Sequence, residues 1–145
     1  MRTRASALLI AFIAVYALAQ TSDTPAYHAQ PPARGQQLPA ILTEAQLAER
    51  GVTDPGAIAA YRAAAKAQNV LYQQPCYCHC DRSQGHTSLH SCFENLHGSN
   101  CGTCMQEALF AYSMSKKGWT AKQIRDAIEK GQYTSVSLRN PPVVN

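Results

Sequence analysis

The sequence has few charges and gathers none of them into a patch. Charged side chains are 15% of the 145 residues, and they form neither a basic stripe nor an acidic block. A nucleic-acid-binding surface needs lysine and arginine clustered on one face, and charge-driven membrane binding needs a similar patch. We therefore expect neither nucleic-acid binding nor a charge-driven membrane role.

The chain also lacks an internal repeat and any segment that reads as a clear β-strand. Its length predicts one domain, which we place at residues 40–132. A domain of this size is small for a self-sufficient core, and such domains often depend on disulfides or a metal. The predicted fold class is all-α, a small helical domain with an irregular Cys/His-rich loop block.

The longest apolar run lies at the N-terminus. It covers residues 5–19, follows Arg2 and Arg4, and ends in a small-x-small pattern at Ala19. A membrane-spanning helix needs about 20 apolar residues, and this run is shorter. The layout is typical of a secretory signal peptide, so we predict that residues 1–19 are removed and that the mature chain is exported to an oxidising compartment. No cysteine follows the run directly, so a lipid anchor is not expected.

The segments that flank the domain have no helical or strand period. Residues 20–39 are rich in proline, glutamine, alanine and threonine, and they are predicted to be a flexible spacer. Residues 133–145 contain two consecutive prolines and are predicted to be an extended tail.

Capping residues, helical periodicity and glycine or proline stops predict five helices in the domain. Two of them begin with the capping-box spacing, Thr43 with Gln46 and Thr120 with Gln123. Their predicted ranges are residues 43–50, 54–73, 88–97, 102–117 and 120–130.

All six cysteines and four of the five histidines lie between residues 76 and 104. Thiolate and imidazole are the ligands of Zn(II) and Cu(I) in proteins. Six sulfurs exceed the four ligands of one tetrahedral site. Metal binding would therefore imply two ions, a shared-thiolate cluster, or one ion and one disulfide.

The spacing of the thiols suggests two ways of holding an ion. Cys101 and Cys104 are spaced so that two sulfurs reach one ion from the start of a helix, where the helix dipole favours thiolates. Cys76, Cys78 and Cys80 would all point to one side in an extended strand. In a tight loop, these three thiols could wrap one ion or bridge two.

Other uses of the cysteines stay open. Three disulfides are the ordinary expectation for an exported chain, although a direct bridge from Cys76 to Cys78 would be strained. A dithiol oxidoreductase could use Cys101 and Cys104, but the βαβ context of such enzymes is missing. Covalent haem would need a histidine after Cys104, where the chain has Met105.

The histidines differ in their promise as ligands. His86, six residues before Cys92, is the best non-sulfur candidate. His79 lies between two thiols and would point away from them in an extended segment. His90 could share a helix face with His86, but the helix predicted from residue 88 does not include both. His97 is interpreted as a solvated residue at a helix end.

The carboxylates near the later thiols, Glu94 and Glu107, form no catalytic set. Glu107 follows Cys104 by one turn and could accept a hydrogen bond from a ligand. The simpler interpretation is an exposed helix residue. No enzymatic activity is predicted.

Several strings in this part of the chain resemble one bacterial family. They are Pro75-Cys-Tyr-Cys-His-Cys80, Gly85-His86, Ser88-Leu89, Cys92-Phe93 and Cys101-Gly-Thr-Cys104. Together they resemble the PCYCGC-motif (CYCXC) proteins, which are exported, often as lipoproteins, and whose function is not established. The resemblance covers about residues 74–130 and implies a location in the periplasm or outside the cell.

The family pattern carries over to seven positions of this sequence. They are Cys76, Cys78, Cys80, His86, Cys92, Cys101 and Cys104. The family usually has glycine where this chain has His79, so the resemblance gives His79 no role.

We therefore predict an exported, non-enzymatic protein that holds Cu(I) or Zn(II) through these seven residues and captures, stores or delivers the metal. Delivery would require a metal-handling protein as a partner. The alternatives are a disulfide-stapled structural or binding module and a thiol–disulfide oxidoreductase that uses Cys101 and Cys104.

Overall fold

The computed structural model describes residues 23–145, and within them it contains helices and no strand. The all-α fold class is therefore confirmed for this part of the chain. The predicted signal peptide at residues 1–19 lies outside the described residues. From residue 23 onwards, no helix is both long enough and apolar enough to cross a membrane.

Residues 23–145 contain six α-helices and three 3₁₀-helices. The α-helices are α1 (Glu44–Glu49), α2 (Pro55–Lys66), α3 (Gln68–Leu71), α4 (Cys80–Gln84), α5 (Gly102–Lys116) and α6 (Ala121–Glu129). The 3₁₀-helices are η1 (Leu89–Phe93), η2 (Leu96–Asn100) and η3 (Gln132–Ser135).

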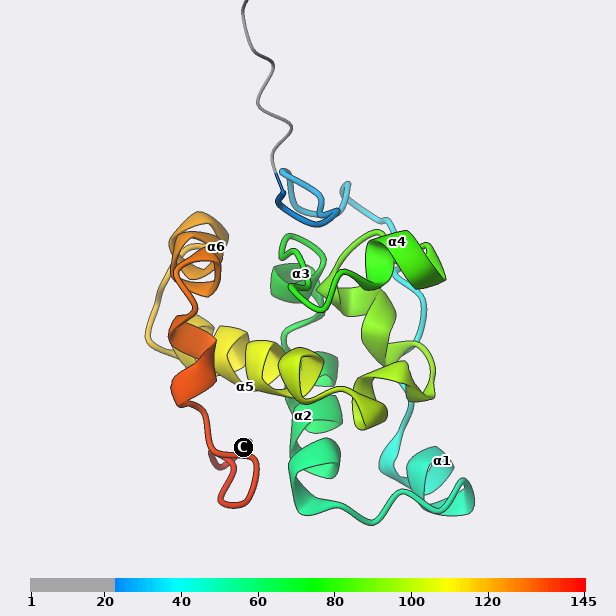
Figure 1. The fold of residues 1–145 in the computed structure, drawn as a ribbon. Coiled ribbons are helices and arrows are strands. Elements are labelled where there is room, and N and C mark those ends of the chain that lie inside the picture. Colours follow the sequence, from blue (N-terminus) through cyan, green and yellow to red (C-terminus); the bar gives the residue numbers. More distant parts are fainter. Residues whose placement is uncertain (1–22) are drawn as a thin grey trace, which may run out of the picture.

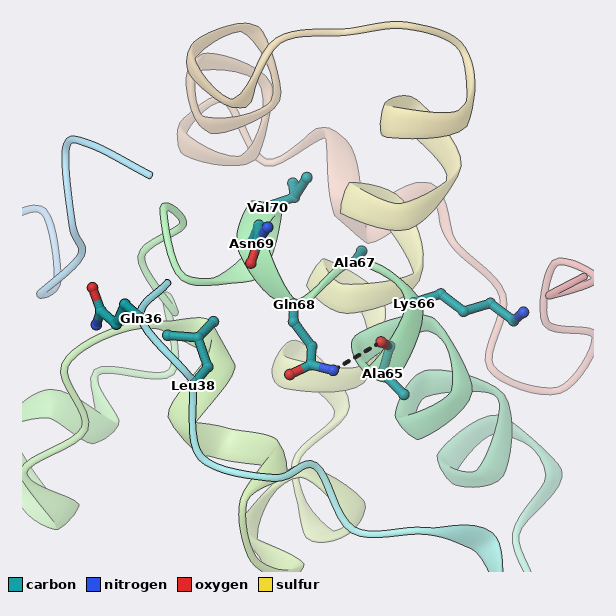
Figure 2. Close-up of a pocket in the computed structure, with 8 residues that line it drawn as sticks. All are labelled: Gln36, Leu38, Ala65, Lys66, Ala67, Gln68, Asn69 and Val70. Atoms are coloured by element: carbon teal, nitrogen blue, oxygen red, sulfur yellow. Dashed lines mark hydrogen bonds between the residues drawn. The ribbon is translucent and has the colours of Figure 1, made fainter. Parts of the chain in front are cut away.

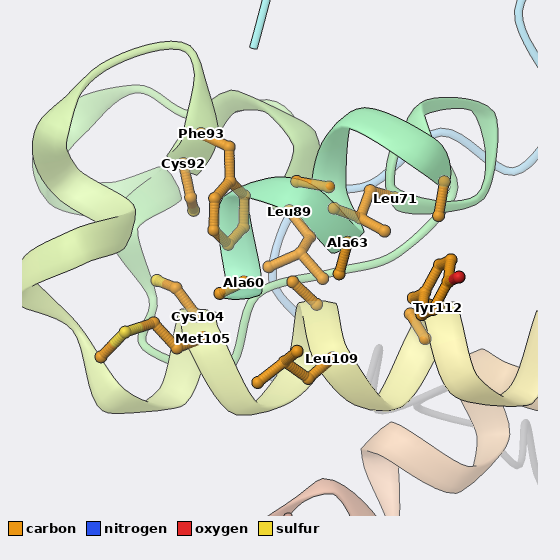
Figure 3. Packing of buried hydrophobic residues seen from close by; sticks show 14 of the residues in the cluster. Ala60, Ala63, Leu71, Leu89, Cys92, Phe93, Cys104, Met105, Leu109 and Tyr112 are labelled. Carbon is orange, nitrogen blue, oxygen red and sulfur yellow. The ribbon is translucent and has the colours of Figure 1, made fainter. Parts of the chain in front are cut away.

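The core is built where α2 and α5 pack together. Figure 3 shows Ala60 and Ala63 on α2 facing Leu109 on α5, and all three side chains are fully buried. Small alanine side chains let two helix backbones approach closely. In Figure 1, α4 and the 3₁₀-helices η1 and η2 gather at the start of α5, and α6 lies near its other end.

The caps that mark the helix starts form as the sequence predicts. The N–H of Gln46 donates to Thr43 Oγ1 at 3.3 Å, and the N–H of Thr43 donates back to Gln46 Oε1 at 2.9 Å. Thr120 and Gln123 make the same reciprocal pair. Asp54 Oδ1 accepts from the N–H of Ala57 at 2.8 Å. These local bonds satisfy amides that the first helical turn leaves without partners.

The helix predicted over residues 54–73 is divided in two. Ala67 takes φ −119° and ψ 27°, outside the helical range, and separates α2 from α3. The residues around the break are ordinary helix formers, so no local signal marks it. The break instead follows from tertiary packing, because the new direction of α3 buries Leu71 completely in the core.

Two further differences fall in the thiol-rich part of the chain. The helix predicted over residues 88–97 is two 3₁₀-helices, η1 and η2, because Asn95 interrupts it and caps the second one. The five-residue helix α4 was not predicted.

Residues 23–39, predicted as part of a flexible spacer, have no helix or strand but lie against the body. The ring of His28 stacks on Tyr72 with centroids 3.8 Å apart, and the Ala26 N–H donates to Asp81 Oδ2 at 3.1 Å. The predicted tail begins with η3 and then continues without regular structure.

The tail is held against the two long helices. Tyr112 on α5 donates its hydroxyl to the carbonyl of Asn145 at 2.8 Å. A Cβ added to Gly56 on α2 would lie 2.6 Å from the carbonyl oxygen of Leu138. Glycine at this position therefore permits the close passage of the tail.

Candidate metal centre

A turn brings the sulfurs of the Cys-x-Cys-x-Cys string together. The N–H of His79 donates to the carbonyl of Cys76 at 3.0 Å, and Cys80 then begins α4. His79 has φ 56°, in the left-handed region, and is the single non-glycine residue with positive φ among residues 23–145. The string is therefore a tight loop, one of the two forms considered from the sequence.

Three sulfurs form what we term the first trio. The Sγ atom of Cys76 lies 3.3 Å from that of Cys78 and 3.4 Å from that of Cys104, and the last two are 3.6 Å apart. Cys101 and His97 lie at its edge, because their ligand atoms and those of Cys78 and Cys104 are all within 4.8 Å of one another. The imidazole of His97 contacts this trio through its Nε2, which lies 3.7 Å from Cys78 Sγ.

A second trio lies beside the first. The Sγ atoms of Cys80 and Cys92 are 3.3 Å apart. His86 Nδ1 lies 3.2 Å from the first of these sulfurs and 3.4 Å from the other. All three pairs of ligand atoms are thus equally close, and the ring of His97 is also within 4.8 Å of them.

Cys76 connects the two trios. Its sulfur lies within 4.8 Å of Cys78 and Cys80, and also of Cys92 and Cys104. Figure 3 shows Cys92 and Cys104 beside the apolar core, on opposite sides of the space between η1 and α5.

The sulfur spacings suit ligands that share an ion. They are 3.3–3.6 Å, well above the length of about 2.05 Å of a disulfide bond, and all six cysteines are free. Two sulfurs bound at about 2.3 Å to one tetrahedral zinc lie about 3.8 Å apart. The sulfurs of the trios are therefore slightly closer together than in a metal-bound site, and binding an ion would need only a small outward movement of them.

The seven residues predicted as ligands all fall in these groups, and one further residue joins them. His97 was interpreted as a solvated helix end, and this was wrong because its ring is half-buried against Cys78 and lies 5.0 Å from the ring of His86. Its N–H donates to Asn95 Oδ1 at 2.7 Å, which fixes the start of η2. The spacing of His97 from the cysteines does not signal this placement.

A glycine contact presses η2 onto η1 and so positions His97. A Cβ added to Gly98 would lie 2.9 Å from both the carbonyl oxygen of Cys92 and the ring of Phe93. Backbone and an aromatic ring cannot move aside easily. Glycine next to His97 was therefore the available signal that another segment approaches here.

The other two histidines of residues 76–104 stay outside the ligand groups. His90 is buried, and its Nδ1 lies 2.9 Å from Glu94 Oε1. The ring of His79 is held near Tyr77, and its Nε2 is 4.0 Å from Asp23. Neither side chain belongs to a group of three or more ligand atoms that could hold an ion.

Glu107 is fully buried, so its interpretation as an exposed helix residue was wrong. Its Oε1 accepts a hydrogen bond from the Tyr77 N–H at 2.9 Å, which ties the ligand loop to α5. Burial raises the pKa of Glu107 to about 8, against the opposing effects of the Tyr77 amide and the Cys76 thiol. The carboxyl is therefore mostly protonated at neutral pH and adds little charge beside the sulfurs.

The close packing of the thiols gives them different pKa values. Hydrogen bonds from Cys101, Cys104 and Cys76 lower the pKa of Cys78. Hydrogen bonds with Cys101 and Cys76 raise the pKa of Cys104. The thiols thus share protons in the absence of a cation, and a bound metal ion would replace those protons.

A surface pocket of about 420 Å³ lies elsewhere, at the break between α2 and α3 (Figure 2). Gln36 and Leu38 form one side of it, and on the other side the Gln68 side chain donates to the carbonyl of Ala65 at 3.1 Å. Its lining contains no cysteine, histidine or carboxylate. Of its lining residues, only Lys66 is ionisable, and the pocket therefore offers no soft metal ligand.

Comparison with known proteins agrees with the resemblance noted from the sequence. Neither a curated protein nor a solved structure gives a significant match. A family model described as "Protein of unknown function with PCYCGC motif" matches residues 33–137, which include every candidate ligand. The chain belongs to the PCYCGC-motif family.

Proposed function

We propose that this protein is an exported, non-enzymatic metal-binding protein that holds Cu(I) or Zn(II) and captures, stores or delivers the ion. The observation that carries the proposal is the pair of ligand trios, in which six ligand atoms lie 3.2–3.6 Å from their partners. Sulfur and imidazole nitrogen are the donors that both ions prefer.

The apolar surroundings support ion binding by the trios. Cys76, Cys80, Cys92 and Cys104 are at most 3% exposed. Several thiolates cannot be buried together without a cation, because each repels the others in a medium of low dielectric. A soft cation removes this repulsion and holds the short elements in place.

A disulfide-stapled module remains the principal alternative. Cys76 lies 3.4 Å from Cys104, and Cys80 lies 3.3 Å from Cys92, so oxidation could bridge both pairs after small movements. This alternative gives no reason for His86 and His97 to point their ring nitrogens at sulfur. The imidazole contacts favour the metal.

The oxidoreductase alternative has less support. The attacking cysteine of a dithiol enzyme is accessible and has a lowered pKa. Here the hydrogen bond with Cys104 lowers the pKa of Cys101, but the Cys78 thiol and burial outweigh it and the pKa is raised. Hydrogen bonds with Cys101 and Cys76 raise the pKa of Cys104, which is fully buried.

The first test is elemental analysis of the mature protein, purified from the exported fraction without chelator, with thiols counted on the same sample. We expect stoichiometric copper or zinc, and thiols that react only after the metal is removed. Absence of both metal and free thiols would overturn the proposal and favour disulfides.

A variant series then assigns the ligands. Serine at both Cys78 and Cys101 should abolish tight metal binding. Alanine at His86 should weaken binding, whereas alanine at His28, which stacks on Tyr72 and belongs to none of the ligand groups, should leave binding unchanged. Full metal content in the double serine variant would contradict the proposal.

A further inference from the structure

We infer that the thiols hold two ions rather than one, joined through the sulfur of Cys76 as a shared ligand. This inference rests on the proposed function and adds the number of ions and their connection. It starts from the count of ligand atoms available to each trio.

The first ion can use the three sulfurs of the first trio, Cys76, Cys78 and Cys104, with Cys101 as its fourth ligand. The sulfurs of Cys78, Cys101 and Cys104 lie within 4.8 Å of one another, and that of Cys76 lies 3.3 Å from Cys78 and 3.4 Å from Cys104. Structural zinc is almost always bound by four ligands in a tetrahedron. A first ion can therefore be held on the side of the cluster formed by the start of α5 and η2.

The second trio has three ligands and lacks a fourth. Cys80, Cys92 and His86 form a triangle with sides of 3.2–3.4 Å. His97 also lies within 4.8 Å of this group. Its Nε2 is 3.7 Å from Cys78 Sγ, farther than any ligand pair within the trios, so its ring serves as a hydrogen-bonding partner of that sulfur. The second ion therefore needs another donor.

Cys76 is the donor in the right place. Its sulfur lies 3.3 Å and 3.4 Å from Cys78 and Cys104 in the first trio, and within 4.8 Å of Cys80 and Cys92 in the second. A thiolate has several lone pairs, so one sulfur can bind two soft ions together. Since Cys76 is 3% exposed, no solvent competes for those lone pairs.

The two ions would differ in access. In the second trio, Cys80 and Cys92 are 2% and 0% exposed. Around the first ion, Cys78 and Cys101 are partly exposed. Ions would therefore enter and leave through the first trio, and the second ion would exchange more slowly.

The experiment uses the full mature chain, reduced and metal-free, titrated separately with Zn²⁺ alone and with Cu⁺ alone. Native mass spectrometry counts the bound ions, and X-ray absorption at the metal edge detects a neighbouring metal. We expect at least two ions for wild type and a metal–metal scattering shell, because a shared sulfur holds the ions close together.

The Cys76→Ser variant should lose the metal–metal shell and one equivalent of ion. The matched Cys101→Ser variant, which changes a ligand that only the first ion uses, should keep the second ion. Circular dichroism of each variant checks that the helices form, and the wild-type scattering shell tests the inference even where a variant fails to fold.

The outcomes separate this inference from the proposed function. Binding of neither ion by wild type would overturn both. Saturation with a single ion, or two ions without a metal–metal shell, would overturn the shared cluster and leave the proposed function standing. Retention of the shell by Cys76→Ser would show that another sulfur is the bridge and would overturn the assignment.

Discussion

Two regions of this molecule are stabilised in different ways. The helical frame, which we define as α2, α5 and α6, consists of helices of 9 to 15 residues with capped or hydrogen-bonded ends and buried apolar faces. The thiol block, residues 76–104, contains helices of only five residues before α5 begins, and two residues, His79 and Gly85, in the left-handed conformation. Apolar burial stabilises the frame, whereas the block brings together donors that need a cation.

The helix α5 joins the two regions. Its first turn carries Cys104, its second carries Glu107 beneath the ligand loop, and Leu109 then packs into the frame. The rigid part of the molecule thus supplies fixed positions to the adaptable part. This arrangement leads us to expect that metal loading stabilises the block far more than the frame.

Metal removal should therefore have the largest and most local effect. A ligand at about 1,000 times its Kd stabilises the state that binds it by about 4 kcal/mol. Hydrogen exchange should show strong loss of protection in residues 76–100 after chelation and a small change in α2. Equal loss in both regions would mean that they unfold as one unit and would remove the distinction.

Shortening a buried side chain of the frame should destabilise the metal-bound and the metal-free protein equally. Leu109→Ala deletes a fully buried side chain and should lower the free energy of unfolding by about 3 kcal/mol. Urea unfolding with and without metal should give the same difference. Val143→Ala, at a position that is 78% exposed, is the matched control and should change stability by less than about 0.5 kcal/mol.

The Glu107→Gln variant tests the junction between the regions through its pH dependence. The folded pKa of Glu107 is about 8, above its ordinary value of 4.5, so the unfolded chain loses this proton first as pH rises. In the metal-free wild type, the stabilisation contributed by protonated Glu107 should be fully present below about pH 4.5. It should be lost as the pH rises to about 8. Relative to Glu107→Gln, wild type should lose about 2 kcal/mol between about pH 5.5 and 7.

Urea unfolding of both proteins at several pH values measures this difference and cancels the titration of the thiols. A constant difference across the range would contradict the assignment of a neutral, buried carboxyl at residue 107.

The smallest effect concerns the ligand loop. His79 has φ 56°, which costs a residue with a side chain about 1–2 kcal/mol, and the PCYCGC motif has glycine at this position. His79→Gly should therefore stabilise the metal-free protein by about 1 kcal/mol or less, since glycine also gains freedom in the unfolded chain.

His79→Ala is the matched control, because it removes the same ring but keeps the Cβ. It should not stabilise the protein in the same thermal unfolding experiment. If both variants behaved alike, the ring contacts with Tyr77 and Asp23, rather than the backbone, would govern this position.

Much of the fold could be predicted because it depends on local signals. The capping boxes at Thr43 and Thr120 and the start of α5 at Gly102 are encoded within a few residues of each helix end. The break at Ala67 was missed because its cause, the burial of Leu71, lies in the packing. The elements of the thiol block were less predictable because they are too short to show a period.

By itself, the sequence determined the all-α class, the family and the donor types, because caps, motif spacing and ligand chemistry are local properties. Only the tertiary structure decided that His97 joins the thiols while His90 pairs with Glu94, and that Glu107 is buried. These outcomes depend on how η2 rests on η1 through Gly98 and how α5 lies beneath the ligand loop. Contacts between distant segments set them, and no spacing along the chain records such contacts.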